Sequence, residues 1–218
     1  MTEVKKQVLV VEDHPLFCER LTQLINYEPD LQVGAQTGNA KDAIQWILNS
    51  SPDLAIVDVT LPGASGLELV KRIRAISTKL PVLVLSMHDE SLYAERAIRA
   101  GASGYITKTQ GADEVVAAIR HILAGEIYLS PKMTADFLKR LASPVSKNTP
   151  SLIDRLTDRE LDVLDLIGRG LTTRQIGERL EIGAATVDTY RARIREKLNM
   201  RNSTELQHFA VRWVSEQE

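Results

Sequence analysis

Short apolar runs alternate with helical apolar stripes along the first 124 residues of the chain. Apolar runs bounded by turn residues predict buried strands, here at 7–11, 32–36, 54–57, 81–85 and 104–107. Between them, apolar residues recur three or four positions apart, which predicts helices with one buried face. These stripes are Leu16, Leu21, Leu24 and Ile25; Ala43, Ile44, Ile47 and Leu48; Leu67, Val70 and Ile73; Tyr93, Ala97 and Ile98; and Val115, Ala118, Ile119 and Ile122. Five strands alternating with five helices predict an α/β domain with a five-stranded, parallel, doubly wound sheet.

The alternation ends near residue 124, and the pattern of the remaining chain is different. Residues 125–151 are expected to form a linker with a short helix at 133–141, because 143–151 are polar, contain prolines and show no period. From residue 152 every segment has helical spacing, with helices expected at 158–167, 172–180, 184–198 and 204–214. We therefore expect an α/β domain at 1–124, a linker at 125–151 and a small all-α domain of four helices at 152–218.

Composition narrows the class of protein. The chain has 218 residues, of which 44% are hydrophobic and 26% charged, as in globular proteins. A net charge of -2 argues against a non-specific polyanion binder. The single cysteine, Cys18, excludes an internal disulfide and fits a reducing cytoplasm. No apolar run approaches the ~20 residues that cross a bilayer, and the first residues lack the apolar segment of a signal peptide, so we expect a cytoplasmic protein without a membrane partner.

Charged and hydroxyl side chains follow the predicted strands at the point where each strand ends. Glu12 and Asp13 follow the first strand, and Asp58 follows the third. Ser86 closes the fourth strand and Lys108 the fifth. In open α/β sheets, ligands bind at this carboxyl edge. Three carboxylates would repel one another there without a cation, and oxygen ligands of this kind suit Mg²⁺. A lone acidic residue at a strand end is often only a turn cap, but the five residues together favour a site.

Two histidines adjoin the same edge. His14 follows Glu12-Asp13 directly, and His88 lies two residues after Ser86. We expect both to be capping or solvated side chains rather than catalytic ones.

The residues at the strand ends resemble the receiver domain of two-component response regulators, over residues 7 to about 124. The matching motifs are Glu12-Asp13, Asp58 with Leu61-Pro62 and Gly66, Ser86, and Gly104-Tyr105-Ile106-Thr107-Lys108. The resemblance implies a flavodoxin-like sheet and a partner, a sensor histidine kinase, whose phosphohistidine would donate a phosphoryl group to Asp58. It also implies that phosphorylation would switch the protein.

The resemblance implies a role for each of the other residues as well. The expected ligands of Mg²⁺ are Glu12, Asp13, Asp58 and the backbone carbonyl of Thr60. Lys108 and the Ser86 hydroxyl would contact the phosphoryl oxygens. Tyr105 would be the aromatic side chain that rotates after Ser86 moves. The chemistry is consistent with these roles, because phosphoryl transfer needs positioning and charge neutralisation more than covalent machinery.

Two other functions fit parts of this pattern. An aspartyl-phosphate hydrolase of the haloacid dehalogenase type would use Asp-x-Asp, whereas Thr60 stands two positions after Asp58. An enzyme is therefore not expected. A regulator that controls DNA without phosphorylation would not need the complete acidic set, which argues against that alternative too.

Residues 172–198 have the proportions of a helix-turn-helix. At 100° per residue, Val187, Ile194 and Leu198 share one stripe of the second helix with Tyr190 beside it, and this stripe should be buried. The side chains expected to point away are Asp188, Thr189, Ala192, Arg193 and Glu196, with Arg191 and Arg195 on one flank and Lys197 on the other. Residues 186–201 carry five basic and two acidic groups, five minus two giving a net of +3. A basic helical face is often only solvated, but this spacing favours double-stranded DNA.

Residues 155–214 also resemble the LuxR-type four-helix DNA-binding domain. The matching motifs are Leu156-Thr157-x-Arg159-Glu160, Gly170-Leu171-Thr172, Ile176-x-x-x-Leu180, and Thr186-Val187-x-x-Tyr190-x-x-x-Ile194-x-x-Lys197-Leu198. Joined to a receiver, this domain is typical of the NarL/FixJ class, which implies a phosphorylation-dependent transcriptional regulator that is a homodimer when phosphorylated. The residues expected at the DNA are Arg174, Thr186, Asp188, Thr189, Tyr190, Arg191, Ala192, Arg193, Arg195 and Lys197.

Three positions depart from the LuxR-type pattern. One is Gly183, near which serine or threonine is frequent in this family, and glycine is a tolerable N-cap. Tyr190 stands where this family often has histidine, and an aromatic ring with a polar tip can pack in the same way. Asp188 stands at a position expected to face bases, where it can accept from a cytosine amino group but repels phosphate. These departures concern the sequence preference and not DNA binding itself.

Overall fold

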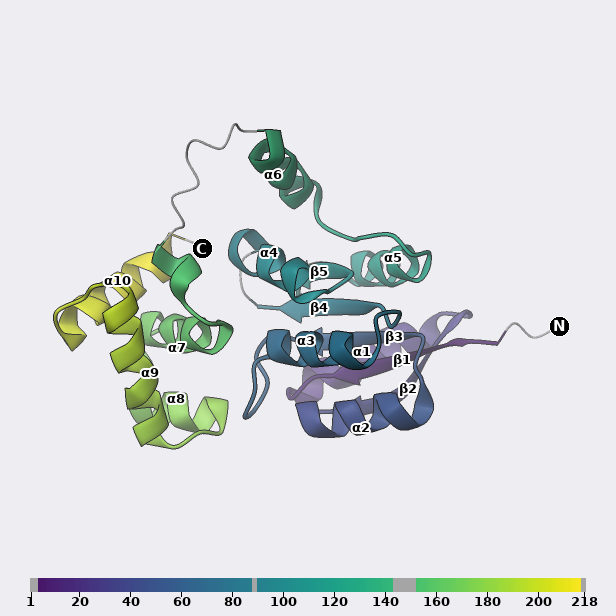
Figure 1. Ribbon diagram of the computed structural model, residues 1–218. Coiled ribbons are helices and arrows are strands. Elements are labelled where there is room, and N and C mark those ends of the chain that lie inside the picture. The colour runs from purple at the N-terminus through teal and green to yellow at the C-terminus, as the bar shows by residue number, and fades with distance from the viewer. Residues whose placement is uncertain (1–3, 88–89, 143–151, 217–218) are drawn as a thin grey trace. The chain divides into compact units, whose positions relative to one another are not determined.

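The structure is a computed structural model that describes residues 4–87, 90–142 and 152–216. The chain divides into two compact units, Met1–Leu141 and Ala142–Glu218 (Figure 1). Within the described ranges, no helix is both long and apolar enough to cross a membrane. The predicted polar linker at 143–151 and the predicted role of His88 lie outside the described residues.

The first unit alternates strands and helices as the apolar pattern predicted. Its strands are β1 (Lys6–Val11), β2 (Leu31–Thr37), β3 (Leu54–Asp58), β4 (Val82–Ser86) and β5 (Gly104–Thr107). Its helices are α1 (Pro15–Tyr27), α2 (Ala40–Ser50), α3 (Gly66–Ile76), α4 (Glu90–Ala100), α5 (Ala112–Leu123) and α6 (Pro131–Ala142). The predicted alternation is therefore confirmed, and α6 is the short helix expected after it, with one more residue at its end and two at its start.

In the described residues the strands form one parallel sheet in the order β2-β1-β3-β4-β5, with helices on both sides (Figure 1). This is the flavodoxin-like order, and the fold-class prediction is confirmed. The strand order reverses between β1 and β3, where ligands bind in such sheets. Val11 pairs with Val57 in that register, so Glu12 and Asp58, the residues that follow this pair, come out side by side at the carboxyl edge.

The central strands are buried on both faces, which explains their continuous apolar sequence. Every residue of β3 and β4 is buried. On one face, Cys18, Leu21 and Ile25 of α1 pack with α5 against β1, β3 and β4. Two predicted core positions are wrong: the exposed fraction is 79% at Leu16 and 61% at Leu48. Leu16 lies 200° around the helix from Cys18, and Leu48 lies 100° beyond Ile47, so each falls off the buried stripe at 100° per residue.

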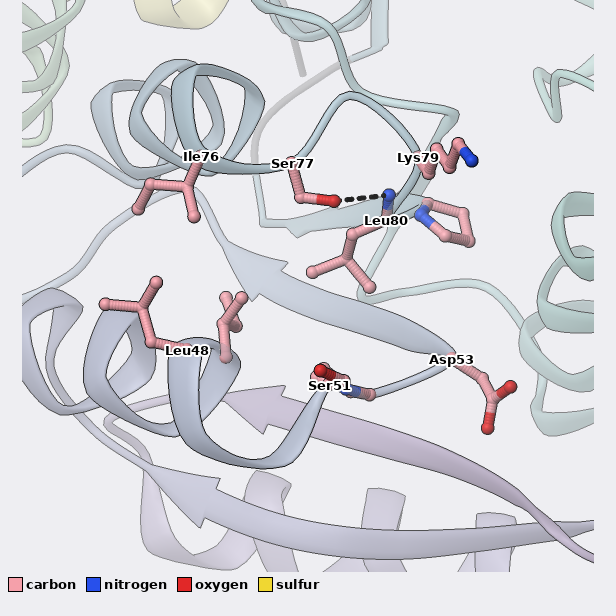
Figure 2. Close-up of a pocket in the computed structure, with 10 residues that line it drawn as sticks. Leu48, Ser51, Asp53, Ile76, Ser77, Lys79 and Leu80 are labelled. Carbon is pink, nitrogen blue, oxygen red and sulfur yellow. Dashed lines mark hydrogen bonds between the residues drawn. The ribbon is translucent and has the colours of Figure 1, made fainter.

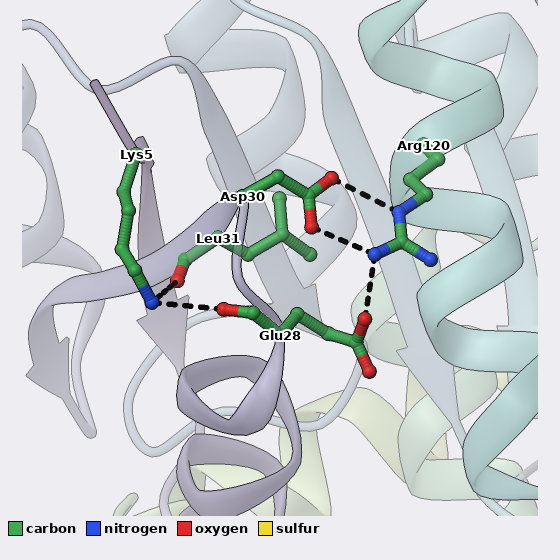
Figure 3. Close-up of polar contacts among 5 residues, drawn as sticks. All are labelled: Lys5, Glu28, Asp30, Leu31 and Arg120. Carbon is green, nitrogen blue, oxygen red and sulfur yellow. Dashed lines mark hydrogen bonds and ion pairs between the residues drawn. The ribbon is translucent and has the colours of Figure 1, made fainter. Parts of the chain in front are cut away.

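A polar network ties α5 to the turn between α1 and β2 (Figure 3). The Arg120 guanidinium donates to both carboxylate oxygens of Asp30, at 2.7 and 3.0 Å, and to Glu28 at 2.5 Å. Lys5 Nζ donates to the backbone carbonyls of Glu28 and Leu31, at 2.8 and 3.2 Å. Arg120 is largely solvated, so these ion pairs fix the position of α5 more than they add to stability.

In the described residues of the second unit, helices are the only regular secondary structure. It contains a 3₁₀ helix, η1 (Leu152–Arg155), followed by α7 (Asp158–Gly168), α8 (Thr173–Leu180), α9 (Ala184–Lys197) and α10 (Ser203–Ser215). The four predicted helices are confirmed, whereas η1 was not predicted. Thr157 with Glu160 and Thr172 with Gln175 form capping boxes at the starts of α7 and α8. Thr172, predicted as the first residue of a helix, is thus its N-cap.

Helix α9 packs through the stripe that its periodicity predicted. Val187, Ile194 and Leu198 are buried, and Tyr190 beside them is half-buried. The α8–α9 turn begins at Glu181, whose positive φ of 52° ends α8 in the left-handed region. The stripe fixes the rotation of α9 and leaves its opposite face to solvent.

Candidate functional site

The carboxyl edge of the sheet brings together the charged residues predicted from the strand ends. We call the group formed by Glu12, Asp13, Asp58, Ser86 and Lys108 the acidic rim. Lys108 Nζ lies 2.6 Å from Glu12 Oε2 and 2.9 Å from Asp58 Oδ2. Glu12, Asp58 and Ser86 are all buried, and the Lys108 side chain is only 4% exposed. The rim is therefore a set of desolvated charges that hold one another, and not a solvated surface.

The position of Lys108 follows from the pairing of β4 with β5. Ser86 pairs with Thr107 at the end of this ladder, and the Lys108 backbone N–H donates to the Ser86 carbonyl at 2.7 Å. The Lys108 ammonium also lies 4.7 Å from the centre of the Phe17 ring, a favourable cation–π distance. The last ladder residues of β5 thus direct the lysine inward to Asp58.

Burial dominates the acidity of Asp58. The pKa of the Asp58 carboxyl is raised from 3.8 to about 6, and loss of solvent is the largest cause. The Lys108 ammonium counters part of that rise, whereas the nearby Glu12 and Asp13 carboxylates add to it. A carboxylate with a raised pKa is a stronger base, and any cation that enters the rim would stabilise its ionised form.

The rim fits a divalent cation by its donor chemistry. One ligand atom from each of Glu12, Asp13, His14 and Asp58 lies within 4.8 Å of the others. Three of these are carboxylate oxygens, the donors that Mg²⁺ prefers. With Lys108 included, three negative groups and one positive group leave a charge of about -2 when all are ionised, which a divalent ion would neutralise.

The loop after β3 passes very close to the rim. Thr60 forms an antiparallel bridge with Ser65, and the Gly66 N–H donates to the Val59 carbonyl at 2.7 Å. A Cβ added at Gly66 would overlap the Asp58 carbonyl oxygen. Gly66 is therefore required by close backbone approach, and the loop holds Thr60 two residues beyond Asp58.

Ser86 lies at the end of β4, the strand next to β3, and Tyr105 lies on β5, the strand beyond β4. Ser86 is fully buried at the end of β4, and Tyr105 is buried within β5, where it pairs with Val84. Both therefore belong to the same packed layer as Asp58, which pairs with Leu85. The predicted rotation of Tyr105 stays a prediction.

His14 lies beside the acidic rim and contacts two of its carboxylates, which the sequence did not predict. It was expected to be a cap or a solvated side chain, and it does occupy the N-cap position of α1. In the described structure, however, its side chain makes no capping hydrogen bond, and Nδ1 lies 3.0 Å from both Glu12 Oε1 and Asp13 Oδ1. The signal in the sequence was its place directly between Glu12-Asp13 and the helix-starting Pro15.

The outward side of α9 carries the predicted DNA-binding residues. Most of them are exposed: Thr186, Asp188, Thr189, Ala192 and Arg193, together with Arg174 on α8. Tyr190, Arg191, Arg195 and Lys197 are half-buried. We call the exposed side of α9, together with Arg191 and Arg195 on its flank and Arg174 on α8, the basic face. Two of its members are engaged locally, since Thr189 Oγ1 donates to the Ala185 carbonyl at 2.9 Å and Arg174 pairs with Glu178 at 2.8 Å.

Lys197 has a second role that the sequence did not indicate. Its ammonium lies 2.6 Å from Glu160 Oε2, and the same carboxylate oxygen accepts from the Thr157 N–H at 2.8 Å in the capping box of α7. These contacts hold the pKa of Glu160 below its usual range despite the opposing effect of burial. Lys197 therefore ties the end of α9 to the start of α7.

A pocket of about 350 Å³ lies away from the rim, at the opposite edge of the sheet (Figure 2). It is bounded by the ends of α2 and α3 and the starts of β3 and β4, and the Leu80 N–H donates to Ser77 Oγ within its wall. None of the described residues of the rim or of the basic face lines it. It shares no group with either candidate site.

Comparison with known proteins matches both units. Residues 8–120 match the family described as response regulator receiver domain, and residues 154–210 match bacterial regulatory proteins of the luxR family. The chain is 33% identical over 206 residues to the response regulator GacA of Pseudomonas aeruginosa, which covers 94% of this chain and 95% of that protein. It is 28% identical over 210 residues to the oxygen regulatory protein NreC of Staphylococcus carnosus, covering 94% and 97%.

Two solved structures are similar as well. A LuxR-family two-component response regulator from Aurantimonas sp. SI85-9A1 aligns with a TM-score of 0.60 at 34% identity, covering 64% of this chain and 100% of that chain. The response regulator ChrA of a heme-sensing two-component system aligns with a TM-score of 0.52 at 26% identity, covering 96% and 97%.

Proposed function

This chain belongs to the transcriptional response regulators that join a receiver domain to a LuxR-family DNA-binding domain, and on that premise we propose that Asp58 is its phosphoacceptor. The donor would be a phosphohistidine of a sensor histidine kinase. One Asp58 carboxylate oxygen attacks phosphorus, the P–N bond breaks, and its electron pair stays on the imidazole nitrogen. We assign residues 1–124 to the receiver, 125–151 to the linker and 152–218 to the DNA-binding domain.

The observation that carries this proposal is the contact of the Lys108 ammonium with both Asp58 and Glu12 in a buried rim. A carboxylate becomes a useful nucleophile when it is aimed and when the charge around it is neutralised. Lys108 supplies one positive charge next to the attacking oxygen and to the phosphoryl oxygens that follow it. Ser86, fully buried at the end of the neighbouring strand, offers a hydroxyl to the same group.

Mg²⁺ is the proposed cofactor. Glu12, Asp13, Asp58 and the backbone carbonyl of Thr60 would hold it, in keeping with the oxygen donors of the rim. When bound, the ion would neutralise charge on the transferring phosphoryl group. Glu12 and Asp13 would hold the ion beside Asp58, and Glu12 and Asp58 keep the Lys108 ammonium in place.

Phosphorylation is proposed to act on the second unit through Ser86 and Tyr105. Ser86 would follow the phosphoryl oxygens, and Tyr105 on the adjacent strand would rotate into the space left behind. The change would favour a homodimer, because paired DNA-binding units match a palindromic site. Sedimentation of the full chain with and without beryllofluoride, which mimics the phosphoryl group, should show an increase in mass. An unchanged mass would remove dimerisation from the switch.

The basic face of α9 is proposed to lie in the major groove of double-stranded DNA. Arg193, Asp188 and Thr189 are exposed there. Arg193 and Thr189 would reach base edges or phosphates, and Asp188 would reach base edges. Arg174, Arg191 and Arg195 would contact the backbone from its flanks. The remaining predicted contacts are Thr186, Tyr190, Ala192 and Lys197. We propose a cytoplasmic location, because the protein would meet both its target DNA and the phosphodonor domain of its histidine kinase there.

Phosphorylation by acetyl phosphate tests the first step. The intact mass of the full chain should rise by one phosphoryl group with Mg²⁺ and stay unchanged in EDTA. The Asp58→Asn protein should not be modified, because its amide cannot attack phosphorus. Modification of this variant, or modification in EDTA at the same rate, would contradict the proposal. Asp42→Asn, an exposed carboxylate on α2, is the matched control and should be phosphorylated normally.

A further inference from the structure

The acidic rim contains a nitrogen donor beside its carboxylates. His14 Nδ1 lies 3.0 Å from Glu12 Oε1 and 3.0 Å from Asp13 Oδ1. Two donor atoms bound at right angles to one ion, each at about 2.1 Å, stand about 3.0 Å apart. Because an Asp58 oxygen also lies within 4.8 Å of these atoms, the spacing suits neighbouring ligands of a single ion.

The local structure turns the His14 ring toward the rim. His14 is the N-cap of α1, yet no capping hydrogen bond from its side chain occurs in the described structure. Pro15 follows at the first helical position, where it needs no backbone donor. The His14 backbone N–H donates to Glu12 Oε1 at 3.0 Å, so the short link between β1 and α1 folds back on the carboxylate. The side chain is 41% exposed, which leaves an approach from solvent.

An imidazole changes which ions a carboxylate site prefers. Mg²⁺ takes oxygen ligands, whereas Zn²⁺, Ni²⁺ and Cu²⁺ bind imidazole nitrogen well and exceed the lighter divalent ions in affinity at mixed sites. We infer that His14 supplies a nitrogen ligand to the rim, which therefore binds divalent transition ions, with Zn²⁺ as the probe, more tightly than Mg²⁺. These ions would displace Mg²⁺ from the same carboxylates.

The inference uses the carboxylates of the proposed function and adds a second class of ligand for them. A simpler role for His14 would be that of a hydrogen-bond donor that only positions Glu12 and Asp13. In that case the loss of the imidazole would weaken the binding of Mg²⁺ and of the transition ions to the same extent. Selective loss of the transition ion is the outcome that separates a ligand from a positioning residue.

Titration calorimetry of the full chain, metal-free at the start, makes this comparison. His14→Asn keeps a donor N–H in place of the ring but is a poor ligand for Zn²⁺, and His14→Ala serves as a second variant. The Zn²⁺ dissociation constant should rise about tenfold or more in both, since loss of an indirect partner already costs that much. The Mg²⁺ constant should change less than about twofold. Co²⁺ gives a direct signal, because an imidazole on this paramagnetic ion has strongly shifted ring protons that His14→Asn should abolish.

Two controls address binding elsewhere. His121→Ala removes an exposed histidine that pairs with Glu126 at 2.9 Å, and Cys18→Ser removes the buried thiol; both should leave the Zn²⁺ constant unchanged. Unaltered Zn²⁺ affinity in the His14 variants, an equal loss for Mg²⁺, or a Zn²⁺ site that follows His121 or Cys18 would overturn the inference. Failure of the proposed function shows separately, as Mg²⁺ affinity that is insensitive to Asp13→Asn.

Discussion

The acidic rim and the basic face of α9 use charge in opposite ways. In the rim, the buried Lys108 ammonium lies within 2.9 Å of both Glu12 and Asp58, whereas Arg193 and Asp188 extend into solvent. A buried charge depends on its partners, so that a change in any one alters both stability and chemistry. An exposed charge is already solvated, so its loss changes what the surface binds and leaves the fold alone. Substitutions at the two sites should therefore separate into two kinds.

The largest effect is expected at the backbone beneath the rim. Gly66→Ala should lower the free energy of unfolding of the receiver by about 3 kcal/mol or more, because the new Cβ overlaps the Asp58 carbonyl oxygen, a backbone atom that cannot turn aside. Urea denaturation followed by circular dichroism measures the change. Gly111→Ala is the control, since an added Cβ there meets nothing within 4 Å. Equal stability of the two variants would show that the loop yields without cost.

Asp58→Asn should stabilise the metal-free protein at neutral pH. The folded-state pKa of Asp58, about 6, lies above its ordinary value of 3.8. The carboxyl therefore favours the fold when protonated, and this contribution is lost as the pH rises from about 4 through 6. The variant should gain about 1–3 kcal/mol over the wild type above pH 6, and the two should converge below pH 4. Melting curves in EDTA test this, and a variant less stable at pH 7 would contradict it.

Arg193→Ala should leave stability unchanged and weaken DNA binding. An exposed arginine at the major groove contributes about 1–2 kcal/mol, or roughly tenfold in affinity. Fluorescence anisotropy on a selected duplex at two salt concentrations gives the affinity, and the melting temperature gives the stability. Arg99→Ala, which removes an exposed arginine of the receiver, should affect neither. A loss of stability in Arg193→Ala would mean that the basic face is not simply solvated.

Substitutions of the Glu160–Lys197 pair should have an effect between those at the buried rim and those at the exposed basic face. Glu160 is buried, but the Lys197 side chain is 34% exposed, so solvent screens part of their attraction. A double-mutant cycle with Glu160→Gln and Lys197→Met should give a coupling of about 0.5–1 kcal/mol in the unfolding of the second unit. A coupling near zero would show that the ion pair does not stabilise the second unit, and would leave DNA contact as the proposed role of Lys197.

Much of the rim could be predicted from the sequence, because the topology of a parallel sheet determines where the strand ends lie. Strands such as β3 and β4 are buried on both faces and therefore appear as unbroken apolar runs. Once the sheet is parallel, the residues that end those strands must meet at one edge. The basic face was predictable for a simpler reason, since a single helix at 100° per residue fixes which side chains point outward.

Some core positions were predicted wrongly, and two contacts were not predicted. Leu16 was grouped with the apolar stripe of α1, but it lies 200° around the helix from Cys18, off the buried stripe, and it is 79% exposed. The turn of the His14 ring toward Glu12 and Asp13 depends on how the chain leaves β1. The contact of Lys197 with Glu160 joins residues that are 37 positions apart, and no local pattern encodes it.

The buried rim is proposed to control the exposed basic face, and the DNA affinity of the full chain before and after phosphorylation measures this coupling. The full chain and its Asp58→Asn variant would each be titrated with a selected duplex, before and after treatment with acetyl phosphate and Mg²⁺. We expect the wild type to gain about tenfold or more in affinity, a coupling in the usual range, and Asp58→Asn to gain nothing. Equal gains in both proteins, or no gain in a wild type whose mass shows full phosphorylation, would contradict it.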